Sequence, residues 1–263
     1  MLRLKNIYKT FNANTINEKV ALENINLVLN DGDFVTVIGG NGAGKSTLQN
    51  VISGTITPDY GTVEINNVNI TKLPEHKRAK YIGRVFQDPM LGTASDMWIE
   101  ENLALALKRG ERRSAFRWMI NTKNTKFFKE QLERLGLGLE DRLKTKVRLL
   151  SGGQRQAITL LMSTLKKPDL LMLDEHTAAL DPKTASLVLG LTDEIVKTSN
   201  ITTLMITHNM RDALAYGNRL IMMDQGKIIF DVAGEEKKKL TVEDLLKKFN
   251  TTKDAPSDAM ILG

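Results

Sequence analysis

A glycine-rich stretch at residues 39–47, GGNGAGKST, constrains the fold of this chain more than any other feature. An apolar, β-branched run at 34–38 precedes it and predicts a buried strand, and apolar residues at helical spacing follow it from Leu48 to Ile52. Glycines let successive backbone N–H groups curl around an anion, and a helix N-terminus adds the positive end of its dipole. The order strand, glycine turn and helix therefore predicts a loop that cradles phosphates.

Two side chains at the end of this loop carry its predicted chemistry. Lys45 is expected to bring a positive charge to the outer phosphates, and the Ser46 hydroxyl is expected to bind Mg²⁺. The residues predicted to contact the nucleotide here are Gly39, Gly40, Asn41, Gly42, Ala43, Gly44, Lys45, Ser46 and Thr47. The loop predicts binding of a nucleoside triphosphate, and it leaves open how the energy is used.

Composition narrows the class of protein. With 263 residues, 41% hydrophobic and 26% charged, the chain suits one large α/β domain or a domain with a sizeable insertion. It has no cysteine, which excludes disulfides and fits a reducing compartment. No apolar run has the length of a signal peptide or of a membrane span, so any spanning segments are expected in other chains.

The net charge of +6 and the pI near 9.3 raise the question of nucleic acid or an anionic membrane surface. The excess is partly local, because residues 108–126 hold seven basic residues and one acid, Glu111. A local role for this segment is favoured over DNA binding by the whole protein.

Hydrophobic periodicity predicts an α/β fold with an inserted helical part. Strands at 2–8 and 20–29, joined by turns, indicate an N-terminal antiparallel β subdomain, and Phe11 is expected in the polar loop that follows the first strand. Residues 88–165 carry helical patterns, at 100–107, 127–135 and 154–165. Further strands are expected at 34–38, 62–65, 82–86, 169–173, 202–206, 220–223 and 227–232, and further helices at 182–197, 211–216 and 241–249.

The strand ending in Asp174 and Glu175 carries the second chemical motif. Asp174 suits Mg²⁺, directly or through water, and Glu175 can orient and deprotonate a water in line with the γ-phosphate. The alternative is a strand end with two solvated acids. The phosphate loop upstream favours the catalytic interpretation.

Residues 150–154, Leu-Ser-Gly-Gly-Gln, open the helix of residues 154–165 and form a second potential anion site. A single bound nucleotide would occupy only one of the two phosphate sites predicted in this chain. The simplest explanation is that Ser151, Gly152, Gly153 and Gln154 contact a nucleotide held by a second copy of the chain. The alternative is a helix N-cap formed by Ser151, with or without a ligand.

The stretch at 150–154 resembles the signature of ATP-binding-cassette (ABC) ATPases, and the resemblance runs from residue 1 to about 250. It implies a P-loop NTPase core, with a mixed sheet and an N-terminal antiparallel β subdomain, carrying an inserted helical subdomain. It also implies ATP and Mg²⁺ as cofactors and hydrolysis of ATP to ADP and phosphate. The domain is expected at 1–250, with its core at about 1–87 and 166–234, the helical subdomain at about 88–165, and a C-terminal helix and mobile tail at 235–263.

The resemblance also implies roles for residues that carry no signal by themselves. Phe11 matches the aromatic residue that stacks on adenine, although a small core aromatic is the alternative, and Gln87 matches a glutamine that senses Mg²⁺. Asp181 matches a loop that communicates across the dimer, and His208 matches the switch histidine that contacts the γ-phosphate. The implied catalytic residues are Glu175, His208 and Lys45, and the implied metal ligands are Ser46, Gln87 and Asp174.

His176 departs from the family pattern, which usually has proline after the catalytic glutamate. A histidine here is not expected to remove hydrolysis. We expect it to be tolerated at a surface turn.

The stretches 83–89 and 173–184 resemble stand-alone ATPase subunits of bacterial importers, and among them subunits that pair with a separate permease and a lipoprotein-type binding protein, some linked to aromatic amino acids. The implied assembly is a head-to-tail, ATP-dependent homodimer at the cytoplasmic face of the membrane, with the binding protein as an indirect partner. Permease helices are expected near 87–107, where Met90, Leu91 and Met97 suit either docking or core packing. The alternative is a soluble ABC ATPase acting on nucleic acid or in a metabolic complex, supported only by the basic segment 108–126.

Overall fold

The protein, in a computed structural model, is described for residues 1–111 and 120–250. It divides into two compact units. The first consists of Met1–Arg78 and the described part of Asn200–Gly263, and the second of Ala79–Ser199. Half of the basic segment and the expected mobile tail lie outside the described residues.

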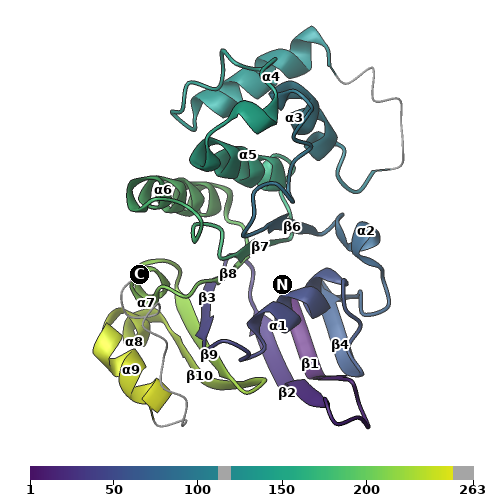
Figure 1. Cartoon of the computed structure of the whole chain (residues 1–263), viewed down its shortest axis with the longest axis vertical. Coiled ribbons are helices and arrows are strands. Elements are labelled where there is room, and N and C mark those ends of the chain that lie inside the picture. The colour runs from purple at the N-terminus through teal and green to yellow at the C-terminus, as the bar shows by residue number, and fades with distance from the viewer. Residues whose placement is uncertain (112–119, 251–263) are drawn as a thin grey trace. The chain divides into compact units, whose positions relative to one another are not determined.

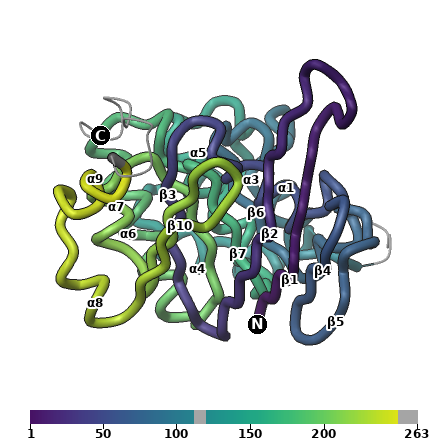
Figure 2. Tube along the Cα trace, turned by 90° about the horizontal axis from the view of Figure 1, so that it is seen from below, coloured from purple at the N-terminus to yellow at the C-terminus, as the bar shows by residue number. Residues whose placement is uncertain are grey.

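An antiparallel sheet forms the amino-terminal part of the first unit (Figure 1). Its order is β2 (Lys19–Leu29), β1 (Leu2–Phe11), β4 (Tyr60–Ile65) and β5 (Val68–Asn69). Strand β1 continues to Phe11, which pairs with Lys19, so the prediction that Phe11 lies in a loop is wrong. The hairpin of β1 and β2 is long, and Figure 2 shows its turn, in dark purple, extending past β4.

Four strands of a mixed sheet also belong to the first unit, in the order β10, β9, β3 and β8. Strand β3 (Phe34–Gly39) pairs in parallel with β8 (Thr203–Ile206) and β9 (Arg219–Asp224), while β10 (Lys227–Ala233) runs antiparallel to β9. Every residue of β3 is buried. The expected combination of a mixed sheet and an antiparallel sheet is confirmed.

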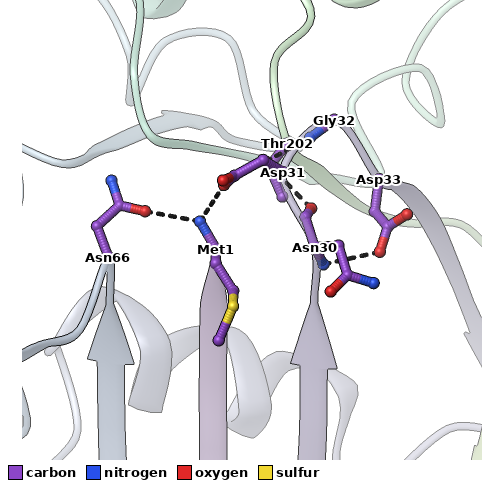
Figure 3. Close-up of polar contacts among 7 residues, drawn as sticks. All are labelled: Met1, Asn30, Asp31, Gly32, Asp33, Asn66 and Thr202. Carbon is purple, nitrogen blue, oxygen red and sulfur yellow. Dashed lines mark hydrogen bonds and ion pairs between the residues drawn. The ribbon is translucent and has the colours of Figure 1, made fainter.

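The turn between β2 and β3 is hydrogen-bonded through its backbone to residues at the start of β8 (Figure 3). The Thr202 hydroxyl accepts a hydrogen bond from Gly32 N at 3.0 Å, and Asp33 O accepts one from Thr203 N at 2.8 Å. Asp31 and Asn66 both bind the amino group of Met1, as Figure 3 shows. The bonds from the turn to Thr202 and Thr203 align the amino-terminal ends of β3 and β8. The phosphate loop and His208 follow the opposite, carboxyl-terminal ends of these strands.

Helix α1 (Lys45–Ser53) follows the glycine loop. A short helix, α2 (Glu75–Arg78), supplies the side chain that binds the carboxyl-terminal end of α1. Arg78 is 1% exposed, and its guanidinium donates to Val51 O and Ile52 O at 2.7 Å each, in the last turn of α1. It also donates to Thr71 O at 2.7 Å and Leu73 O at 2.8 Å. A buried cation therefore occupies carbonyls that α1 leaves without helical partners.

Three helices complete the described part of the first unit: α7 (Met210–Ala215), α8 (Gly234–Lys238) and α9 (Val242–Asn250). Leu245 and Phe249 of α9 pack in one apolar cluster with Met210 and Ala213 of α7. Helix α8 was not predicted. Its Lys237 is buried and donates to the carbonyls of Tyr216 and Gly217, just after α7.

The second unit joins a parallel strand pair to helices. Strand β6 (Ile82–Val85) pairs with β7 (Leu170–Asp174). The main helices are α3 (Ile99–Leu107), α4 (Thr122–Glu133), α5 (Gly152–Thr164) and α6 (Pro182–Ser199), and η2 (Val147–Leu149) is a short 3-10 turn. Helix α4 begins five residues before the predicted start, because the Asn121 side chain caps it by accepting from Asn124 N.

One apolar core holds these helices together, and its fully buried members run from Ile99 to Leu161. Strands β6 and β7 and helix α6 belong to the same compact unit. The narrower subdomain limits at 88 and 165 stay a prediction. No helix among the described residues is long and apolar enough to cross a membrane.

Candidate functional site

The glycine loop has the backbone geometry that an anion cradle needs. Gly44 is the N-cap of α1 with φ of 100°, and a Cβ there would lie 2.6 Å from Ala21 O. At Gly39 a Cβ would lie 2.4 Å from Met223 O, whereas at Gly40 it would meet nothing within 4 Å. The fold therefore requires glycine at positions 39 and 44, where a Cβ would clash with a backbone carbonyl. At Gly40 no contact of the described residues excludes a side chain.

The helix end at this loop is suited to phosphate. Because Gly44 has no side chain, no capping group covers the first N–H groups of α1, which also carry the positive end of the helix dipole. Asn41 and Ser46 are exposed on the loop. Lys45 is only 5% exposed, and its ammonium donates to Gly39 O at 2.8 Å and Gly40 O at 3.1 Å. These features fit a bound triphosphate.

Lys19 is a candidate site residue that the sequence did not reveal. It is the register partner of Phe11, and its ammonium lies 3.5 Å from the position of a Cβ on Gly42. Phe11 is partly exposed, with the Lys9 ammonium 5.7 Å from its ring centroid. The β1–β2 hairpin thus connects the candidate adenine-stacking residue to a cation beside the phosphate loop.

His208 emerges at the same sheet edge as the loop. Ile206 at the end of β8 pairs with Val37 of β3, and Thr207 N donates to Val37 O at 3.2 Å. The imidazole of His208 is partly exposed, and Asn209 after it caps α7 by accepting from Arg211 N and Asp212 N. Parallel pairing of β3 with β8 therefore places the loop and the histidine at neighbouring strand ends.

The second unit brings Gln87 and the two carboxylates to one edge. Val85 pairs with Leu173 in parallel, so the residues that follow β6 and β7 emerge together. Asp174 is 3.6 Å from the Arg84 guanidinium, which also lies 4.6 Å from the Phe86 ring centroid. Arg84, which the sequence analysis did not select, therefore reduces the negative charge at Asp174.

Gln156 is a third residue, after Lys19 and Arg84, that the sequence alone did not indicate. It is fully buried in α5 and its amide donates to Phe86 O at 3.3 Å. This bond joins the helix that follows the signature to the residue before Gln87. No local sequence signal could have found it, since it depends on two segments 70 residues apart.

The signature segment forms the helix N-cap that is the alternative to a contact with a second nucleotide. Ser151 Oγ accepts from Gln154 N at 3.3 Å, and Gln154 Oε1 accepts from Ser151 N at 3.3 Å. Both residues are exposed or partly exposed. The cap accounts for the serine and glutamine, and it leaves their predicted contact with a second nucleotide untested.

The two glycines of the signature lie against the start of α6. A Cβ on Gly152 would be 3.4 Å from Leu180 Cδ2, and one on Gly153 would be 2.0 Å from Thr184 Cγ2. The Thr184 backbone N–H donates to Asp181 at 3.1 Å. Hydrogen bonds from Thr184 hold the pKa of the Asp181 carboxyl below its usual value. The signature and the loop containing Asp181 are thus neighbours in this unit.

His176 does not lie at a surface turn, so that expectation is wrong. Its side chain is 2% exposed, and Nε2 lies 3.1 Å from Thr192 Oγ1 in α6. Burial lowers the pKa of the imidazole to about 4, so the ring is neutral at physiological pH. A single sequence does not indicate that the side chain of a polar residue just after a strand points into the core.

The proposed metal ligands are oxygen donors of the kind that Mg²⁺ prefers: the exposed hydroxyl of Ser46, the amide of Gln87 and the carboxylate of Asp174. The described residues contain no group of three or more His, Cys, Asp or Glu side chains that would hold a metal by themselves. Ser46 offers its oxygen donor from the phosphate loop of the first unit, and Gln87 and Asp174 offer theirs from neighbouring strand ends of the second.

Comparisons with known proteins agree with this geometry. The sequence profile of the family described as ABC transporter matches residues 22–178. A tyrosine transport ATP-binding protein of Clostridioides difficile (strain R20291) is 47% identical, over 95% of this chain and 98% of that protein. A methionine import ATP-binding protein, MetN 2, of Listeria monocytogenes (strain EGD-e) is 34% identical over 87% of this chain, which spans 65% of its length.

Solved structures give the same result. A dimeric post-hydrolysis state of the ATP-binding cassette MJ0796, bound to ADP and Pi, has a TM-score of 0.75 at 29% identity and covers 89% of this chain and 98% of its own. The ADP conformation of MJ1267, an ATP-binding cassette of an ABC transporter, has a TM-score of 0.77 at 31% identity and covers 93% and 95%. The chain therefore belongs to the ABC transporter family. It is an ATP-binding, ATP-hydrolysing cassette of the kind that serves import systems.

Proposed function

We propose that this cassette energises the import of tyrosine or a related aromatic amino acid through a separate permease. The observation that carries the proposal is the 47% identity with the tyrosine transport ATP-binding protein, which extends over nearly the whole of both chains. The other relatives described above share about a third of their residues. In this proposal, other chains of the transporter recognise the solute.

In the proposed hydrolytic cycle, each candidate residue has one task. The loop amides and Lys45 hold the phosphates, Phe11 stacks on the base, and His208 contacts the γ-phosphate. Mg²⁺, held by Ser46, Gln87 and Asp174, would neutralise charge on the phosphates when bound. Glu175 orients the attacking water in line with the phosphorus–oxygen bond that breaks, and it accepts a proton from this water.

We further propose that two copies of the chain associate head to tail around ATP. Ser151, Gly152, Gly153 and Gln154 of one copy then cover the nucleotide held by the other, with Asp181 beside them. The dimeric state of the MJ0796 neighbour supports this arrangement. ATP closes the dimer, and hydrolysis reopens it.

The surface after Gln87 is our candidate for permease docking. Met90 and Leu91 are 41% and 69% exposed, which disfavours the alternative that they pack in the core of the helices. A cavity of about 450 Å³ lies beside them, lined by Leu91, Leu105, Met162, Arg84 and neighbouring residues. An apolar helix end of a membrane subunit suits this surface, and its docking would place the cassette at the cytoplasmic face.

The hydrolytic assignment is tested with Glu175→Gln. The variant should bind ATP, hydrolyse it at least ~100-fold more slowly, and accumulate as an ATP-bound dimer in size-exclusion chromatography. Ser151→Arg should leave ATP binding by the dilute monomer unchanged and abolish dimer turnover. Wild-type turnover in the first variant, or lost monomer binding in the second, contradicts the assignment.

The solute is tested by uptake in cells of the source organism that lack this chain. Uptake of labelled tyrosine should fall to background and return with the wild-type chain, but not with Glu175→Gln. Methionine uptake in the same cells provides the control and should not change. Normal tyrosine uptake in the deleted cells would reject the proposed solute and leave the ATPase assignment intact.

A further inference from the structure

His176 has no role in the proposed cycle, yet it directly follows Glu175 in the chain and its side chain is buried in the second unit. The side chain is 2% exposed, and its Thr192 partner is 1% exposed. A buried imidazole loses its hydration, so a hydrogen bond inside the protein is needed to compensate it. The bond to Thr192 supplies this compensation and ties the end of β7 to the middle of α6.

The direction of this hydrogen bond follows from the second bond that Thr192 makes. The Thr192 hydroxyl donates its only proton to Val188 O at 2.8 Å. Its oxygen can then only accept, so Nε2 of His176 carries the proton and donates at 3.1 Å. The chain of bonds runs from His176 through Thr192 to a carbonyl of α6, and all of it is buried.

The segment from Glu175 to Asp181 is held to α6 at both ends. Within it, Ala178 N donates to Glu175 O at 2.9 Å and Leu180 N donates to Thr177 O at 3.1 Å. At its far end, Asp181 accepts from Thr184 N in the first turn of α6. At its near end, the His176 side chain is hydrogen-bonded to Thr192 in the middle of α6.

Glu175 itself has a backbone conformation that requires support. Its φ of 43° lies in the left-handed region, which costs a non-glycine residue about 1 kcal/mol or more. Such a conformation persists only where the surroundings impose it. His176 is the adjacent residue, and its fixed ring limits how the peptide between the two can rotate.

We propose that His176 and Thr192 are positioning residues for ATP hydrolysis: their hydrogen bond holds Glu175 in the conformation from which it activates water. The inference rests on the proposed role of Glu175. It predicts an effect on the hydrolytic step and none on nucleotide binding, since a general base must stand within hydrogen-bond reach of its water.

The test removes one hydroxyl and keeps the shape of the side chain. Thr192→Val should lower kcat by about ten-fold or more while KM for ATP stays within about two-fold of wild type. Thr192→Ser restores the hydroxyl and should restore most of kcat. Thr198→Val is the matched control, because Thr198 makes the same 2.8 Å bond to a carbonyl of α6 but is exposed, and its kcat should equal that of wild type.

Two further variants address His176 directly. His176→Gln keeps an N–H donor at about the same reach and should retain more activity than His176→Leu. If His176→Leu does not fold, Thr192→Val still decides the question. Combined with Glu175→Gln, Thr192→Val should leave the amount of ATP-bound dimer unchanged, since the bond acts on hydrolysis alone.

Three results would overturn the inference: normal kcat in Thr192→Val, an equal loss of kcat in Thr198→Val, or a loss of ATP affinity that matches the loss of kcat. Failure of the proposed function has a different signature. If Glu175→Gln hydrolyses ATP at the wild-type rate, the role of Glu175 is wrong. If Glu175→Gln is inactive and Thr192→Val is normal, only the positioning inference is wrong.

Discussion

The ammonium of Lys45 donates a hydrogen bond to the carbonyl oxygen of Gly39 at 2.8 Å, six residues back along the chain. The side chain is 5% exposed, so its charge is held against the backbone of the phosphate loop and not in open solvent. The two carbonyl partners, Gly39 O and Gly40 O, fix the position of this ammonium group within the loop.

We predict that Lys45→Ala abolishes measurable ATP binding, because the loop loses its one full charge for the outer phosphates. The expected loss in affinity is about 100-fold or more, measured by equilibrium binding of a fluorescent ATP analogue. The melting temperature of the variant serves as the control for folding. Normal ATP affinity in a folded variant would contradict the assigned role.

The contact between Gly153 and Thr184 gives a second prediction. Gly153→Ala places a Cβ 2.0 Å from Thr184 Cγ2, which forces the signature helix away from α6, and ATPase activity should fall about ten-fold or more. Thr184→Ser removes that methyl group and keeps the hydroxyl, so the double variant should regain activity.

Gly190→Ala is the matched control for this pair. It lies in α6, a Cβ there meets nothing within 4 Å, and alanine favours a helix by up to about 1 kcal/mol. Its activity should equal that of wild type. A double variant as inactive as Gly153→Ala alone would show that the steric explanation is wrong.

Arg78 yields a prediction about stability. Arg78→Met leaves four carbonyl oxygens of the first unit without their donor and should destabilise the protein by about 2–4 kcal/mol. Chemical denaturation measures the change. Lys77→Met, at the exposed neighbouring position, should change stability by less than about 0.5 kcal/mol. Equal stability of the two variants would show that Arg78 does not stabilise the end of α1.

Lys237 predicts a pH dependence. Burial lowers its pKa to about 8, from 10.5 for an ordinary lysine. Between these two values the unfolded chain binds more protons than the folded one, so this group makes the folded state more stable as pH rises from about 8 toward 10.5. The stability of wild type relative to Lys237→Met should therefore rise over this range, by at most about 3 kcal/mol.

Unfolding experiments at several pH values check this prediction. Lys238→Met is the control, since Lys238 is exposed, and its difference from wild type should not vary with pH in this manner. A pH-independent difference between wild type and Lys237→Met would show that the amine titrates normally in the folded protein.

Much of this protein could be predicted from local patterns. The glycine loop, the buried strand before it, the strand ending in Asp174 and the signature at 150–154 each lie within a few consecutive residues, and hydrophobic periodicity gave most helices and strands. The short helices α2 and α8 were not predicted, because they are four and five residues long and contain no large apolar residue to show a helical periodicity. The start of α4 was predicted too late, because Asn121 caps the helix five residues before its apolar residues begin at Phe127.

The sequence by itself determined the family and the nucleotide chemistry, since phosphate binding depends on glycines, a lysine and a hydroxyl at fixed spacing. Only the tertiary structure decided which polar residues are buried. His176, Arg78 and Lys237 read as ordinary surface residues in the sequence, and each is less than 4% exposed. Their partners are Thr192, the end of α1 and the residues just after α7, at separations of 16 to 27 residues. Burial of a polar group depends on such distant partners, because only they can compensate its lost hydration.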